Sequence, residues 1–149
     1  MEQRVDNHIK LKEIANNFVN RVVLGGVARK SALVVALFGE LGTGKTTFTQ
    51  YVAEVLGIKE RVLSPTFILE RIYKLDGIKN FDNFIHIDAY RLDNAEDLDP
   101  LGWADILKNP KNIIFIEWAD KVENILPKDV IKIRLKHEGG DNRYITIDF

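Results

Sequence analysis

The sequence predicts a single-domain α/β sandwich, in which helices flank a mixed, mainly parallel β-sheet and an antiparallel hairpin ends the chain. Two unbroken apolar runs, at residues 33–38 and 113–116, are typical of strands buried on both faces of a parallel sheet. Stretches with helical spacing separate the strand candidates, which favours helices on both faces of that sheet. Residues 130–135 and 144–149 alternate apolar and polar side chains, which predicts the terminal hairpin. The length of 149 residues suits one domain, so we expect residues 1–149 to form a single unit.

The first half of the chain contains two helix candidates. Apolar residues recur at helical spacing between residues 11 and 22, with Asp6 or Asn7 as the N-cap and two glycines at 25–26 as the stop. A glycine-rich turn follows the first apolar run. The second helix is expected over residues 45–56, because a glycine follows it directly.

The second half starts with extended chain. Residues 67–75 look extended and lead into an Asp-Gly pair, which is a hairpin signal. Residues 84–88 form a short strand candidate. A capping box from Asp93 to Glu96 predicts a helix beyond it, and residues 103–107 predict another.

Composition excludes several classes of protein. The chain has 21 Lys and Arg against 22 Asp and Glu, and this net charge of −1 disfavours a dedicated nucleic-acid-binding protein. Cysteine is absent, so no disulfide framework or thiolate chemistry is available. The longest apolar stretch, residues 32–38, is too short to span a bilayer. We therefore expect a cytoplasmic location without a membrane span.

The strongest motif follows the first apolar run. It fits the phosphate-binding pattern G-x-x-x-x-G-K-[ST] and reads Gly39-Glu40-Leu41-Gly42-Thr43-Gly44-Lys45-Thr46. Glycines let the backbone turn its N–H groups inward, and the following helix adds its positive N-terminus. Lys45 can reach the β- and γ-phosphates, and the Thr46 hydroxyl can ligate Mg²⁺. The motif predicts a P-loop NTPase-like fold that binds a nucleotide with Mg²⁺.

Two acidic residues end strand candidates and can hold the metal from the other side. Asp88 follows one apolar strand, and Glu117 follows another that is more apolar. If both strands run parallel to residues 33–38, both carboxylates emerge beside the P-loop. The alternative is that either acid only ends its strand in solvent. We expect Glu117, and with it Asp88, to act in catalysis by holding metal or orienting water.

Two neighbours of these acids have open roles. His86 lies within a strand candidate and is more typical of a packed, hydrogen-bonded residue than of a proton carrier. Trp118 follows Glu117 and can either stack on a nucleotide or partner, or cap the core.

Five pieces of sequence follow one another along the chain. They are the P-loop with Thr47, then Ser64-Pro65-Thr66-Phe67, His86-Ile87-Asp88-Ala89-Tyr90-Arg91-Leu92, Ile116-Glu117-Trp118-Ala119-Asp120 and Leu126-Pro127. From residue 34 to residue 127 these motifs resemble, in the same order, those of the TsaE (YjeE) family of bacterial ATPases of tRNA threonylcarbamoyladenosine (t6A) synthesis.

The resemblance implies roles for these residues. ATP would contact the loop through Gly39, Leu41, Gly42, Thr43, Gly44, Lys45, Thr46 and Thr47. Thr46 and Glu117 would hold Mg²⁺, with Asp88 as the second acid near the metal. Thr66 would lie close to the γ-phosphate on a switch-like loop. The partners would be the TsaB–TsaD complex, through which the chain would meet tRNA indirectly.

The sequence departs from the family's pattern at three places. The family usually has a nucleotide-binding threonine near the start of its first helix, whereas residues 8–12 contain none. Thr43 stands where alanine is common, and Ala119 where proline is common. The first departure affects the adenine side of the site.

These observations favour a slow ATPase that acts as a nucleotide switch and depends on its partners. A small-molecule P-loop kinase is the alternative, but Arg71 and Arg91 are isolated, and kinases usually carry an arginine-rich lid. A scaffold that binds ATP without hydrolysing it is the third hypothesis. The guanine-reading motif N-K-x-D is absent, which disfavours a GTPase. No arginine stands in a position typical of an arginine finger.

Overall fold

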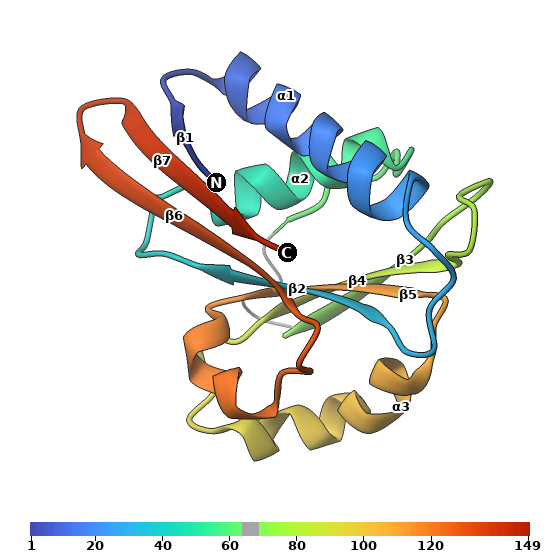
Figure 1. Cartoon of the computed structure of the whole chain (residues 1–149). Helices are drawn as coiled ribbons and strands as arrows, with labels where there is room; N and C mark the ends of the chain where they lie inside the picture. Colours follow the sequence, from blue (N-terminus) through green and yellow to red (C-terminus); the bar gives the residue numbers. More distant parts are fainter. Residues whose placement is uncertain (64–68) are drawn as a thin grey trace.

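The computed structural model describes residues 1–63 and 69–149 of the chain. In these residues, seven strands form one sheet with the order β1-β7-β6-β2-β5-β4-β3 (Figure 1). The strands are β1 (Glu2–Val5), β2 (Leu33–Phe38), β3 (Glu70–Lys74), β4 (Asn83–Asp88), β5 (Asn112–Glu117), β6 (Ile131–Gly139) and β7 (Asn142–Asp148). The helical segments are α1 (His8–Phe18), the π-helical η1 (Val19–Leu24), α2 (Lys45–Val55), the 3₁₀-helical η2 (Ala95–Leu101), α3 (Trp103–Lys108) and the 3₁₀-helical η3 (Ala119–Ile125).

The centre of the sheet is parallel, as the sequence predicts. β2 pairs in parallel with both β5 and β6, and β5 pairs in parallel with β4. β3, β7 and β1 complete the sheet as antiparallel neighbours of β4, β6 and β7. Every residue of β5 is buried, which explains its unbroken apolar sequence. The expected α/β sandwich with a mixed sheet and a C-terminal hairpin is confirmed.

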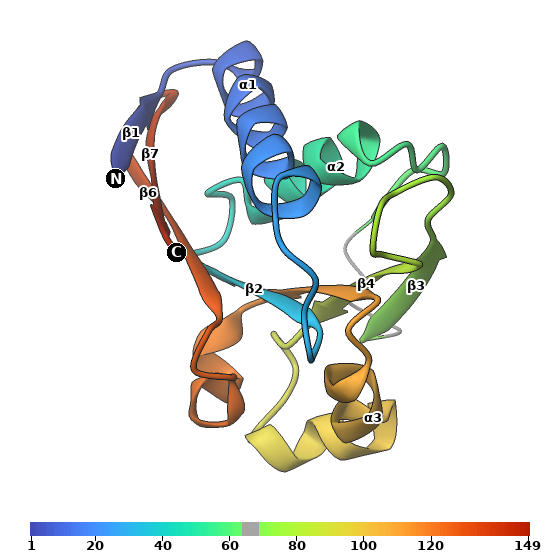
Figure 2. The same ribbon diagram turned by 45° about the vertical axis from the view of Figure 1, so that its right-hand side comes forward.

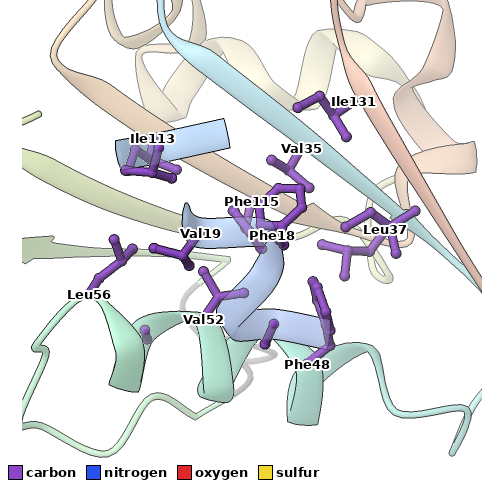
Figure 3. Close-up of a cluster of buried hydrophobic side chains, with 14 of the residues drawn as sticks. Phe18, Val19, Val35, Leu37, Phe48, Val52, Leu56, Ile113, Phe115 and Ile131 are labelled. Carbon is purple, nitrogen blue, oxygen red and sulfur yellow. The ribbon is translucent and has the colours of Figure 1, made fainter. Parts of the chain in front are cut away.

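Helices cover both faces of the sheet. α1 and α2 lie on one face, and α3 lies on the other (Figure 2). Successive residues of β2 point to opposite faces, so Val35 and Leu37 join the core under α1 and α2 while Val34 joins the other. Phe18 and Phe115 hold the first core together, with ring centroids 6.1 Å apart (Figure 3).

Local signals at helix ends match the structure in one case and miss by one residue in another. Asn7 is the N-cap of α1, and its Oδ1 accepts a hydrogen bond of 2.8 Å from the backbone N–H of Lys10. The capping box expected from Asp93 was wrong by one residue, because the N-cap of η2 is Asn94. Asp97 accepts from the backbone N–H of both residues, at 2.9 and 3.4 Å. Asn and Asp both suit an N-cap, so spacing alone did not choose between them.

Other features of the fold lie outside the sequence expectations. β1 was not predicted, and it forms a sheet edge by pairing with β7. The predicted switch-like segment, Ser64–Phe67 with Thr66, lies outside the described residues. None of the helices in the described ranges is long and apolar enough to cross a membrane.

Candidate functional site

The P-loop connects β2 to α2 and is held in a tight turn. Gly39 and Gly44 have φ values of +148° and +104°, which residues with a side chain rarely adopt. The Nζ atom of Lys45 donates to the carbonyl oxygens of Gly39 at 2.6 Å and Glu40 at 2.9 Å. Thr43 Oγ1 donates to the same Glu40 carbonyl at 2.9 Å. These bonds fold the loop around the lysine side chain.

Backbone donors open into the space beside this loop. The first intrahelical hydrogen bond of α2 runs from the N–H of Phe48 to the carbonyl of Gly44, at 2.9 Å. The N–H groups of residues 45–47 therefore have no acceptor within the helix. Together with the helix dipole, such donors favour an anion at this end of α2.

Lys45 is a buried cation with only 4% of its surface exposed. Burial lowers its pKa, while the nearby carboxylates of Glu117, Asp88 and Asp120 act in the opposite direction. Its Nζ atom also lies 4.0 Å from the centre of the Trp118 ring. An anionic ligand in the cavity would favour the charged form of this lysine further.

The two acids predicted at strand ends meet at the carboxyl edge of the sheet. Asp88 and Glu117 are register partners on β4 and β5, and both are almost fully buried. Glu117 Oε1 accepts a hydrogen bond of 2.7 Å from the hydroxyl of Thr46 on α2. Asp88 Oδ1 accepts from the backbone N–H of Tyr90 at 2.9 Å. The geometry brings the P-loop hydroxyl and both carboxylates to one place.

His86 supports Glu117 from inside the sheet. Its ring is fully buried, and its Nε2 lies 2.5 Å from Glu117 Oε2. Because an ionised carboxylate only accepts hydrogen bonds, we place the histidine hydrogen on Nε2. The other ring nitrogen, Nδ1, is buried without a hydrogen-bond partner in the described part of the chain. His86 therefore fixes the Glu117 carboxylate between two donors, itself and Thr46.

A cavity of about 520 Å³ lies in front of these groups. Its lining includes eight of the predicted site residues, Leu41, Gly42, Gly44, Lys45, Thr46, Thr47, Asp88 and Glu117. Gly39 and Thr43 instead line a cavity of about 440 Å³ on the other side of the loop, next to β6. Thr66 belongs to the residues that are not described.

The oxygen donors of the larger cavity fit a magnesium ion. Mg²⁺ prefers hard oxygen ligands and is commonly held by one or two carboxylates together with phosphate oxygens and water. Thr46, Asp88 and Glu117 supply a hydroxyl and two buried carboxylates. The described residues contain no cluster of three or more Asp, Glu or His side chains arranged to bind a metal alone. This donor set suits a metal that arrives with a phosphate ligand.

Sequence reasoning missed two side chains of this cavity. His8, at the start of α1, and Arg143, on β7, both line it. Tyr90 and Trp118 also line it, and their ring centroids lie 5.0 Å apart. Trp118, for which the sequence left stacking on a ligand and capping the core open, directly follows β5, and Tyr90 stands two residues beyond the end of β4. No local pattern points to His8 or Arg143, because they lie on elements far from the P-loop in the chain.

Comparison with known proteins identifies the family. A family model described as "Threonylcarbamoyl adenosine biosynthesis protein TsaE" matches residues 5–145. The chain belongs to the TsaE family. The resemblance inferred from the sequence motifs is therefore confirmed, and with it the family's role in the biosynthesis of threonylcarbamoyladenosine in tRNA.

Individual TsaE relatives cover most of the chain. The "tRNA threonylcarbamoyladenosine biosynthesis protein TsaE" of Bacillus subtilis is 40% identical over 114 residues, which span 76% of this chain and 67% of the relative. The protein of the same description from Treponema pallidum is 34% identical over 125 residues, which span 84% and 87%. The crystal structure of Bacillus subtilis YdiB superposes with a TM-score of 0.70 and 29% identity, covering 99% of this chain and 83% of that one.

Proposed function

We propose that the chain is a Mg-ATP-binding ATPase that acts as a nucleotide switch with the TsaB–TsaD complex in t6A synthesis. The observation that carries the proposal is the arrangement across the 520 Å³ cavity. On one side lie the buried Lys45 and the N-terminus of α2. On the other side lies the buried Glu117, which accepts a hydrogen bond from the Thr46 hydroxyl. This arrangement pairs groups suited to phosphates with groups suited to the metal that accompanies them.

The loop residues would bind the phosphates. Lys45 donates to two loop carbonyls, and the third N–H of its ammonium would donate to a β- or γ-phosphate oxygen. The N–H groups of residues 45–47 would donate to the same phosphates. Because all these donors are fixed before the ligand arrives, binding costs little reorganisation.

Thr46, Glu117 and Asp88 would act at the metal side of the site. Mg²⁺, when bound there, would neutralise charge that develops on the phosphates during hydrolysis. The Thr46 hydroxyl and the Glu117 carboxylate, which His86 holds in place, would be its protein ligands. Asp88 would hold a water molecule of the metal shell or orient the attacking water.

Partners would complete the site. The sequence-based expectation is that Thr66 approaches the γ-phosphate and that a partner contacts the segment that carries it. Leu41 at the tip of the P-loop is 82% exposed and Tyr90 is 51% exposed. Exposed apolar side chains at the mouth of the cavity suit contact with a protein. We propose that the chain works in the cytoplasm, where it meets tRNA through the TsaB–TsaD complex.

The test measures ATP hydrolysis by the purified chain alone, then with TsaB and TsaD, and then with tRNA added. We expect slow single-turnover hydrolysis by the chain alone and faster release of inorganic phosphate with the partners. Lys45→Ala should remove hydrolysis in every mixture. Fast hydrolysis that the partners do not change would contradict the switch. Transfer of phosphate to a small molecule would instead favour a kinase.

A further inference from the structure

Arg143 stands where two cavities meet. Besides the 520 Å³ cavity at the P-loop, a cavity of about 240 Å³ lies between the start of α1 and the β6–β7 hairpin. The smaller cavity is lined by Val5, Asp6, Asn7, His8, Leu11, Asp141 and Arg143. His8 and Arg143 line both cavities. A ligand that extends from the P-loop toward α1 would therefore pass both of these side chains.

The guanidinium of Arg143 lies against the first turn of α2. A Cβ atom built on Gly44 would lie 3.0 Å from Nη1 of Arg143. Gly44 is the N-cap residue of α2, directly before the N–H groups that have no intrahelical acceptor. A Cβ atom at this position would make a tight contact with the guanidinium, so the glycine leaves room for the arginine. The guanidinium is thus placed beside the same anion site as Lys45.

The charge of Arg143 is available to a ligand. The described part of the chain contains no ion pair between Arg143 and a carboxylate within 4.0 Å. The acids of the larger cavity, Asp88 and Glu117, belong to the metal side at the ends of β4 and β5. Asp6 and Asp141 line the smaller cavity on the other side. A planar guanidinium with several donors suits bidentate contact with phosphate oxygens.

We infer that Arg143 is a second phosphate-binding cation of the nucleotide site, supplied by the C-terminal hairpin. The inference rests on the proposed function, since it assigns a ligand contact within that site. Glu117 and Asp88 mark the metal end, where the γ-phosphate lies. Arg143 lies toward the smaller cavity, so it contacts the α- and β-phosphates, and the nucleoside extends past it toward the start of α1.

The experiment compares binding of ATP, ADP and inorganic tripolyphosphate to the full chain by isothermal titration calorimetry. The variants are Arg143→Gln, Arg143→Lys and the control Arg4→Gln. Arg4 carries the same charge on the neighbouring strand β1, but it precedes the inward-facing Val5 and so lies on the opposite face of the sheet. Its side chain donates to Asn142. Melting curves without ligand establish that each variant is folded.

We expect Arg143→Gln to weaken ATP, ADP and tripolyphosphate alike, by about 10- to 100-fold, as is typical for loss of a hydrogen bond between charged groups. Arg143→Lys should fall between Arg143→Gln and the unaltered chain, and Arg4→Gln should match the unaltered chain. If Arg143→Gln is unfolded, Arg143→Lys decides alone through the same three ligands.

Two results would overturn the inference while leaving the proposed function intact. In the first, Arg143→Gln binds all three ligands as the unaltered chain does. In the second, it loses ATP and ADP affinity but keeps that for tripolyphosphate, which would place Arg143 on the ribose or base. Failure of the unaltered chain to bind ATP would instead remove the proposed function, and the inference with it.

Discussion

Gly39→Ala perturbs the first glycine of the P-loop, where the loop packs against the backbone of a neighbouring strand. A Cβ atom at this position would lie 2.6 Å from the carbonyl oxygen of Leu135 on β6 and 2.7 Å from Thr43 Oγ1. The φ angle of +148° is also one that alanine rarely adopts. The carbonyl of Gly39 accepts a hydrogen bond from Lys45, so any shift of this residue reaches the phosphate-binding lysine.

Two costs add up in this variant. Forcing alanine into such a backbone conformation lowers the unfolding free energy by about 1–3 kcal/mol. Overpacking against a strand backbone costs about 1–3 kcal/mol more. The sum is about 2–6 kcal/mol of unfolding free energy. A chain of this length loses about 2–4 °C in Tm per kcal/mol, so Tm should fall by about 4–24 °C.

The assay is urea unfolding and thermal melting without nucleotide, followed by an Mg-ATP titration. Gly42→Ala is the matched control, because Gly42 also has a positive φ, +77°, but a Cβ there meets no heavy atom within 4 Å. The unfolding free energy of Gly42→Ala should fall by only about 1–2 kcal/mol. The reasoning is refuted if Gly39→Ala is within 1 kcal/mol of the unaltered chain, or no less stable than Gly42→Ala.

Four further predictions concern the nucleotide and polar residues of the site and sheet. Mg-ATP at about 100 times its dissociation constant should stabilise the chain by about 2.7 kcal/mol in melting experiments, and Lys45→Ala should abolish this gain. Glu117→Gln should keep ATP affinity within about threefold and slow single-turnover hydrolysis by about 100-fold or more, and Asp88→Asn should have a similar or smaller effect. If Asp88→Asn loses hydrolysis while Glu117→Gln hydrolyses ATP normally, Asp88 and not Glu117 is the main acid on the metal side. His86→Leu should lower the unfolding free energy by about 1–3 kcal/mol in urea, because the Glu117 oxygen loses its buried donor, and unchanged stability would contradict that role. Burial raises the pKa of Glu70, so its charged form destabilises the folded state at neutral pH, and Glu70→Gln should increase the unfolding free energy at pH 7. This gain should shrink as the pH falls toward 4, and a gain that does not change with pH would exclude the charge of Glu70 as the cause.

The sequence was sufficient for features that depend on local patterns. The spacing of the P-loop residues fixes a strand, a turn and a helix within 24 residues, from Leu33 to Leu56. Asp88 and Glu117 follow apolar runs, and parallel strands bring such ends to one edge of a sheet. Both residues were found without knowing the strand order, because strands that run parallel to β2 all end at the sheet edge that carries the P-loop; how near each acid lies to the loop depends on the order β2-β5-β4.

Tertiary structure decided the neighbours that no local pattern encodes. Alternation in β6 and β7 predicts a hairpin but does not say that β6 pairs with β2, and this pairing lays Leu135 against Gly39 and Arg143 against Gly44. The position of His86 within an apolar strand candidate predicts that its ring is packed. Its contact with Glu117, however, depends on the register of β4 and β5. Hydrophobic periodicity specifies which face of an element is buried but not which element covers it, because strand pairing is settled by contacts between distant parts of the chain.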